Sequence, residues 1–127
     1  MRLLIDTHAL LWLLDDRRLS ATAAEAFLRP DVQLFLSVAS YWEICIKVSL
    51  GKLQVADNWP DLIRTEMMAN DIHWLSIDPR HCREVIALPH HHRDPFDRLL
   101  IAQARLEGLT LLSADPNFGR YDVGVVW

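Results

Sequence analysis

The chain has 127 residues, of which 51% are hydrophobic and 24% are charged, and this composition excludes a disordered or low-complexity protein. A chain of this length is expected to form one domain over residues 1–127, because domains typically hold ~100–200 residues. The net charge of −4 argues against a basic domain that simply coats nucleic acid.

The pattern of apolar and polar residues predicts strands that alternate with helices. In chain order, the predicted elements are a strand at residues 2–5, a helix from about residue 8 to 14, a helix at 20–28, a strand at 32–36, a helix at 38–50, a helix from 58 or 59 to 70, a strand at 72–75, a helix at 79–88, a helix at 95–108, and strands at 109–112 and 123–127. Asp6 or Thr7 can cap the first helix, and Asp94 can cap the helix that begins with Pro95. The alternation implies a three-layer α/β fold, with a mostly parallel central sheet and helices on both faces.

Four carboxylates fall where the ends of these elements are expected to meet. In an open α/β sheet, ligands bind outside the carboxyl ends of the strands. Asp6 directly follows the first strand, and Asp115 comes three residues after Leu112, which ends the fourth. Glu43 and Asp97 are expected in the first turns of two helices, which begin at the same edge of a parallel sheet. The four acids are therefore expected to converge.

Each acid also has a purely structural explanation. Asp6 can simply cap its helix, and Asp115 stands in a turn-forming sequence. Ser40 and Glu43 have the spacing of a capping box, in which Glu43 would reach back to a backbone N–H. Glu43 nevertheless lies in an apolar stretch, where a buried charge is costly unless something pairs with it. The prediction of a site therefore depends on the co-location of the four acids.

Converging carboxylates indicate a particular chemistry. They repel one another and destabilise an empty site, so a divalent cation is expected to neutralise them. Ligation by oxygen alone favours Mg²⁺ or Mn²⁺ over zinc, and such a site suits hydrolysis of phosphate esters. Without these four acids, 13 acidic and 13 basic residues remain, so the net charge does not argue against a nucleic-acid substrate.

Four segments carry a family resemblance that extends over essentially the whole chain. They are LIDTH at residues 4–8, YWEI at 41–44, DPFDRLLIAQA at 94–104, which is the most specific, and LSAD at 112–115. In order and spacing they resemble the PIN-domain ribonucleases, most closely the VapC-type toxins of bacterial toxin–antitoxin pairs. The resemblance implies that the catalytic residues are the Mg²⁺-binding quartet Asp6, Glu43, Asp97 and Asp115.

The same resemblance implies an activity and a set of partners. It implies a metal-dependent endoribonuclease that cleaves RNA, forms a homodimer and is inhibited by a cognate antitoxin protein. It implies contact with DNA only indirectly, through the DNA-binding part of the antitoxin. The chain is too short for the additional domains of larger PIN-domain nucleases, which favours the toxin interpretation.

Residues next to the quartet are secondary candidates. Thr7 and Ser113 are placed to orient a carboxylate or a bound water, although helix capping and turn formation explain them equally well. Asp94 is expected to be a helix cap, with a contact to the metal or its ligands as the alternative.

Several basic and aromatic residues are also candidates for contacts. Arg93, or one histidine of the run at residues 90–92, is a candidate for binding RNA phosphates. Arg98 is expected either to touch substrate or to pair with a neighbouring acid. The tryptophans are expected in the core or on a dimer surface; they are Trp12, Trp42, Trp59, Trp74 and Trp127.

The cellular compartment is predicted from what surrounds the cysteines and from hydropathy. No apolar run approaches the ~20 residues that cross a bilayer, and the apolar stretch at the start is too short for a signal peptide. Cys45 and Cys82 have apolar neighbours, so their thiols are expected to be buried and reduced. These features predict a cytoplasmic protein without membrane contact.

Three other functions are weighed against the ribonuclease. A phosphoacceptor module of the receiver type would need paired acids after its first strand and a late lysine, and no lysine follows Lys52. A catalytically silent PIN-like module that only binds a partner has no support, because all four acids are present. An Mg²⁺-dependent phosphohydrolase of another substrate class would use the same acids, and only a substrate assay separates it from the ribonuclease.

Overall fold

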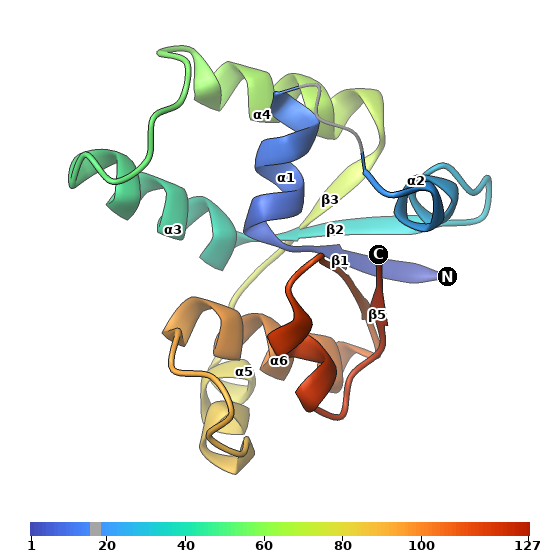
Figure 1. The fold of residues 1–127 in the computed structure, drawn as a ribbon, viewed down its shortest axis with the longest axis vertical. Coiled ribbons are helices and arrows are strands. Elements are labelled where there is room, and N and C mark those ends of the chain that lie inside the picture. Colours follow the sequence, from blue (N-terminus) through green and yellow to red (C-terminus); the bar gives the residue numbers. More distant parts are fainter. Residues whose placement is uncertain (16–18) are drawn as a thin grey trace.

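The computed structural model of this protein describes residues 1–15 and 19–127, and its centre is a five-stranded sheet in the order β3-β2-β1-β4-β5 (Figure 1). The strands are β1 (Arg2–Ile5), β2 (Gln33–Ser37), β3 (Ile72–Leu75), β4 (Thr110–Leu112) and β5 (Val125–Val126). The helices are α1 (Thr7–Leu14), α2 (Ala21–Phe27), α3 (Val38–Ser49), α4 (Trp59–Ala69), α5 (Pro79–Glu84) and α6 (Pro95–Glu107), with short 3₁₀ helices η1 (Val85–Ala87) and η2 (Pro116–Arg120). Each pair of neighbouring strands is parallel. The predicted three-layer α/β fold is confirmed.

The two faces of the sheet bury different side chains, because successive residues of a strand point to opposite sides. Leu3 and Ile5 of β1 pack into one core with residues of α1, α2, α3 and α4. Leu4 packs into the other core with residues of α6, η1 and η2. Figure 1 accordingly shows α1–α4 on one side of the sheet and α5 and α6 on the other. A continuous apolar run such as residues 2–5 is thus explained by burial on both faces.

The strand order creates a crevice next to β1. The chain passes from β1 to β2 and β3 on one side, and then crosses to the other side of β1 to form β4 and β5. Ile5 is in register with Leu36 of β2 and with Leu112 of β4, so the carboxyl ends of these three strands meet at one edge. At a reversal of strand order the connections leave in opposite directions and open a binding crevice. Asp6 lies at this point.

Several predicted helix ends are confirmed. Asp6 is the N-cap of α1, and Asp94 is the N-cap of α6, with Pro95 in its first turn. Gly108 ends α6 at φ +66°, in the left-handed region where a residue without a Cβ is favoured. The predicted capping box of Ser40 and Glu43 is wrong, because α3 begins at Val38 and is capped by Ser37. Glu43 therefore lies in the second turn of its helix and not in the first.

Other expectations need smaller corrections. The predicted helix at residues 79–88 is α5 followed by η1, the strand predicted at 123–127 is only the two-residue β5, and η2 was not predicted. The cysteine thiols are not buried as expected, since Cys82 is exposed and Cys45 is only partly buried. Trp42 and Trp74 are about half exposed. Within the described ranges, no helix is both long and apolar enough to span a membrane.

A buried arginine ties the segment before α6 to the rest of the fold. The Arg98 guanidinium donates to the carbonyls of Pro89 (2.8 Å) and Val85 (3.1 Å). Longer hydrogen bonds reach the carbonyls of Leu88 and His92 and the Tyr121 hydroxyl. Among the residues that the structure describes, Arg98 pairs with no carboxylate, so the predicted ion pair is wrong. Its hydrogen bonds instead fix the path of residues 85–92.

Replacing this arginine should destabilise the protein. Arg98→Met retains most of the apolar stem but leaves several buried carbonyls without a donor, and we expect a loss of about 2–4 kcal/mol in the free energy of unfolding. Arg105→Met, on the same helix but exposed, removes only a long ion pair with Glu84 (3.6 Å) and should cost less than about 0.5 kcal/mol. Urea denaturation of the two variants measures the difference, and equal losses would contradict this role.

Candidate active site

Asp6 is one of two predicted carboxylates that are almost fully buried. It is 3% exposed, and its Oδ1 accepts the Ala9 N–H (2.7 Å) as the cap of α1. Its Oδ2 accepts a hydrogen bond from the Ser113 hydroxyl, just after β4. Burial raises the pKa of the Asp6 carboxyl, although these hydrogen bonds oppose the increase, and the nearby Asp115 carboxylate adds to it.

Glu43 is equally buried, and side chains of this chain contact both of its carboxylate oxygens. The Thr7 hydroxyl donates to Oε1 (2.7 Å). The Lys47 ammonium, one helical turn further along α3, donates to Oε2 at 2.6 Å. The Lys47 ammonium therefore compensates the negative charge that Glu43 carries in its apolar surroundings.

Asp97 lies in the first turn of α6, as predicted. Its backbone N–H donates to the cap residue Asp94 (3.2 Å), and its Oδ2 is 2.7 Å from Nε2 of His92. The His92 Nδ1 accepts the Arg93 N–H (3.2 Å), so the Nε2 carries the hydrogen and donates it to Asp97. Burial and the neighbouring carboxylates of Asp94 and Glu43 raise the pKa of Asp97 to about 6, against the opposing effect of His92.

Asp115 completes the group from the far side of the crevice. It caps η2, and its backbone N–H donates to the Ser113 hydroxyl (3.0 Å), the group that also contacts Asp6. Its Oδ2 is 3.9 Å from the His92 Nε2. Asp6 and Asp115 both line one cavity of about 260 Å³, together with His8 and Trp12.

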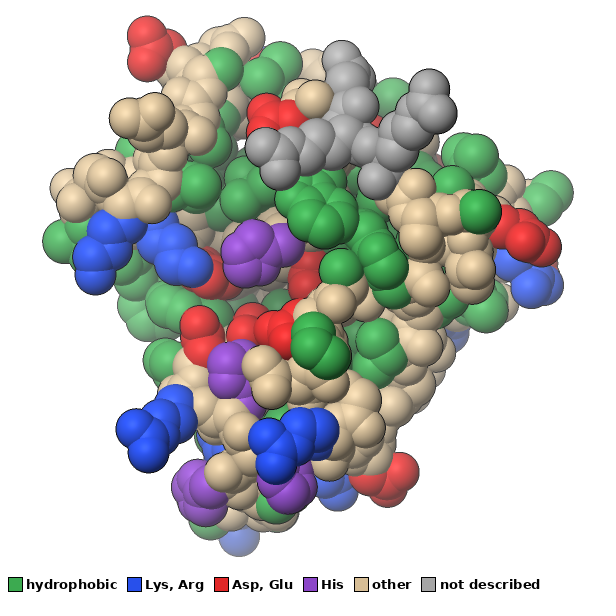
Figure 2. Space-filling view, in the orientation of Figure 1, with side chains coloured by type: hydrophobic (Ala, Val, Ile, Leu, Met, Phe, Trp, Pro, Cys, Tyr) green, Lys and Arg blue, Asp and Glu red, His purple; other side chains and the backbone are tan. Residues whose placement is uncertain are grey.

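These contacts link three of the four predicted acids, Asp6, Asp115 and Asp97. Ser113 joins Asp6 to Asp115, and His92 joins Asp115 to Asp97. Figure 2 shows acidic side chains gathered in a hollow in the middle of this face, with histidines beside them and basic side chains around them. Glu43 acts electrostatically on Asp97 from α3. The helices and loops at this edge of the sheet therefore bring the acids near one another.

The donor set fits a divalent cation. One carboxylate oxygen of Asp97 and one of Asp115 lie within 4.8 Å of each other, and the Asp115 carboxylate acts electrostatically on Asp6. Burial first, and neighbouring carboxylates second, raise the pKa values of Asp6 and Asp97, so a cation bound beside them would stabilise their ionised forms. Carboxylate oxygens at such a place are ligands for Mg²⁺ or Mn²⁺.

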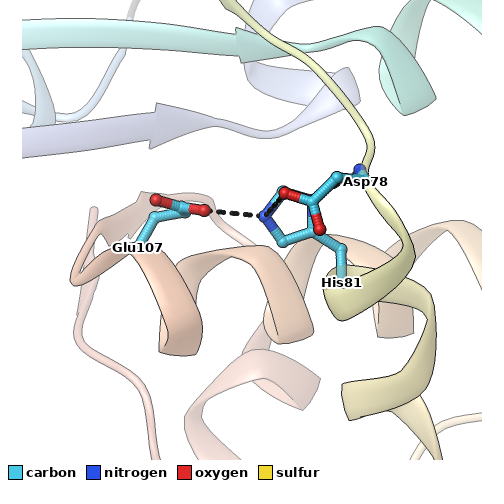
Figure 3. Close-up of side chains that lie close together, drawn as sticks. All are labelled: Asp78, His81 and Glu107. Atoms are coloured by element: carbon cyan, nitrogen blue, oxygen red, sulfur yellow. Dashed lines mark hydrogen bonds and ion pairs between the residues drawn. The ribbon is translucent and has the colours of Figure 1, made fainter.

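A second group of potential ligands has a structural role instead. Asp78, His81 and Glu107 lie together between α5 and α6 (Figure 3). The His81 Nδ1 accepts the Asp78 N–H (3.1 Å), so its Nε2 carries the hydrogen and donates to Glu107 (2.8 Å). Neither ring nitrogen is free for a metal, and the hydrogen bond to His81 holds the pKa of Glu107 below its usual value. The group therefore connects the two helices.

The remaining predicted residues occupy different environments. Thr7 and Ser113 each donate to a quartet carboxylate, as their positions suggested, and Asp94 is a cap beside Asp97. Arg93 is exposed, whereas Arg98 is buried. Sequence reasoning missed Lys47, although its spacing of four residues from Glu43 on a helix was a usable signal.

The family model described as PIN domain matches residues 3–124. No curated protein sequence matches. Among solved structures, VapBC2 from Rickettsia felis, bound to a DNA fragment from its promoter, aligns with a TM-score of 0.74 at 13% identity, covering 98% of this chain and 97% of that chain. VapBC-1 from nontypeable Haemophilus influenzae gives 0.66 at 19% identity, covering 98% and 96%, and a toxin–antitoxin complex from Klebsiella pneumoniae gives 0.62 at 21% identity, covering 98% and 95%.

The raised pKa of Asp97 predicts that this carboxylate destabilises the metal-free protein at neutral pH. Because the folded protein holds the Asp97 proton more tightly than the unfolded chain does, stability falls as pH rises from about 4 through 6. Asp97→Asn should therefore raise the free energy of unfolding by about 1–3 kcal/mol at neutral pH in EDTA, with the gain shrinking near pH 4. Urea denaturation at both pH values measures it.

The matched control is Asp61→Asn, which changes a carboxylate in an exposed ion pair with Arg64. It should alter the free energy of unfolding by less than about 0.5 kcal/mol at either pH. An Asp97→Asn protein no more stable than the wild type in EDTA would contradict the predicted electrostatic strain.

Proposed function

This chain belongs to the PIN-domain family, whose model matches residues 3–124, and from that membership we propose that it is a metal-dependent endoribonuclease and the toxin of a toxin–antitoxin pair. The observation that carries the proposal is the linked set of carboxylates at the end of β1, where the strand order reverses. A site of four acids with two raised pKa values suits cation-assisted hydrolysis of a phosphodiester better than it suits a surface for binding alone.

In this proposal Asp6, Glu43, Asp97 and Asp115 are the catalytic and metal-binding residues. Asp6 and Asp97 are the direct ligands of Mg²⁺, or of Mn²⁺, and Asp115 is the outermost member, acting through water. Glu43 is either a further ligand or the group that orients the attacking water. The bound ion would lower the pKa of that water and stabilise the charge that develops on the phosphate.

The neighbouring side chains hold these carboxylates in fixed orientations. Ser113 and Thr7 donate hydroxyl hydrogens to Asp6 and Glu43, so one oxygen of each acid is held by a fixed donor. His92 does the same for Asp97. RNA would be held at the rim, where Arg93 is exposed and charged.

The proposed partners follow from the proteins that share the fold. The similar solved structures are VapBC or toxin–antitoxin complexes, and one of them includes promoter DNA. We infer a cognate antitoxin as the inhibitor, a homodimer as the assembly, and contact with DNA only through that antitoxin. We also propose a cytoplasmic location, where an RNA substrate and the antitoxin would both be present.

Cleavage of RNA is the first test of the activity. Purified protein, free of antitoxin, should cleave members of a panel of structured RNAs when Mg²⁺ or Mn²⁺ is present and not in EDTA. Asp97→Asn should lower the rate by about 100-fold or more, since a lost ligand removes several kcal/mol of transition-state stabilisation. Asp61→Asn, an equivalent change on the surface, should cleave like the wild type.

The other outcomes separate the alternatives. Equal cleavage by wild type and Asp97→Asn would refute the site. Hydrolysis of small phosphoesters without cleavage of RNA would favour a phosphohydrolase of another class. A folded protein that hydrolyses neither would favour a module that only binds a partner.

Toxicity in cells is a second and independent test. Expression of the chain alone should arrest bacterial growth, and Asp6→Asn should relieve the arrest. The amide retains the cap acceptor for the Ala9 N–H and a polar partner for Ser113, so the variant should accumulate as folded protein. Growth curves with a measurement of the soluble protein level test this. Undiminished toxicity of a folded Asp6→Asn protein would oppose the proposed role of Asp6.

A further inference from the structure

Lys47 is the lysine of the site, and its position is unusual. Its ammonium lies 2.6 Å from the Glu43 Oε2, and the carboxylates of Asp94 and Asp97 also act on it. Lys47 and Glu43 form an ion pair one helical turn apart on α3. The Lys47 side chain is 35% exposed, whereas the Glu43 side chain is 3% exposed.

The charge of Lys47 divides the quartet into two parts. One carboxylate oxygen of Glu43 is paired with the Lys47 ammonium, and the other accepts a hydrogen bond from the Thr7 hydroxyl. Among the residues that the structure describes, neither Asp6, Asp97 nor Asp115 forms an ion pair with a lysine or an arginine. Three acids therefore still require a cation, whereas the fourth already has one.

We propose that Lys47 is the second cation of this site, so that the site takes a single divalent ion, at Asp6, Asp97 and Asp115, with the ammonium occupying the place at Glu43 that a second ion would need. This inference rests on the proposed nuclease function and assigns Glu43 to orienting water and not to binding the ion.

Electrostatics and helix geometry both favour this arrangement. A divalent ion against Glu43 would lie next to the ammonium, and repulsion between the two charges disfavours its entry. Glutamate followed four residues later by lysine is the favourable order of such a pair on a helix, so α3 holds the ammonium in place without any ligand. The positive charge beside Glu43 is thus supplied by the protein itself and is present before any ion binds.

Counting bound Mn²⁺ tests the proposal without any assay of activity. Equilibrium dialysis with elemental analysis should give one ion per chain for the wild type and one for Lys47→Arg, which retains the charge. Lys47→Gln removes the charge, and we expect two ions, since Glu43 becomes a free ligand. Glu43→Gln combined with Lys47→Gln should return the number to one, because the second ion then lacks its carboxylate.

Each other result overturns the inference. Two ions in the wild type, or a single ion in a folded Lys47→Gln protein, would mean that the lysine does not limit metal binding. A lower melting temperature for Lys47→Gln with an unchanged ion count would assign Lys47 a structural role only. No ion bound to any of the four proteins would refute the proposed metal site as well, which separates failure of the function from failure of this inference.

Discussion

Burial of carboxylates, to which their mutual repulsion adds, is the constraint on which the rest of this site depends. Asp6 and Glu43 are almost fully buried, and Asp97 has a pKa of about 6, so each ionised group requires a donor nearby. The donors come from separate parts of the chain; they are Thr7 on α1, Lys47 on α3, His92 before α6 and Ser113 after β4. The crossing at β1 is what brings these segments together.

The buried arginine extends this organisation beyond the cleft. Arg98 bonds the carbonyls of residues 85–92, and the His92 N–H donates to the Tyr121 hydroxyl (2.8 Å), which Arg98 also reaches. The Arg98 guanidinium therefore fixes the segment that carries His92, whose side chain contacts Asp97. Position 98 thus acts on the site through the backbone and not through contact with a ligand.

Local signals in the sequence were enough to predict most helices and strands. They were not enough to predict the contacts between segments that lie far apart in the sequence. Asp94 followed by Pro95 marks a helix start because both residues act within one turn. Glu43 was misplaced because Ser40 imitates a cap, whereas Ser37, at the end of β2, is the true cap. The contact of His92 with Asp97 arises in an irregular segment, where no periodicity relates the two positions. Glu43 and Lys47 are the reverse case, since helical spacing alone predicts their pairing.

The aromatic contact between Trp42 and Phe96 has a mechanical consequence. Their ring centroids are 5.3 Å apart, and the contact joins α3 to α6, which cover opposite faces of the sheet. Glu43 and Asp97 directly follow these two residues in sequence, so the ring contact joins the two helices next to the residues that carry these carboxylates. Because Trp42 is 56% exposed, a partner that binds this ring would also touch the contact between the two helices.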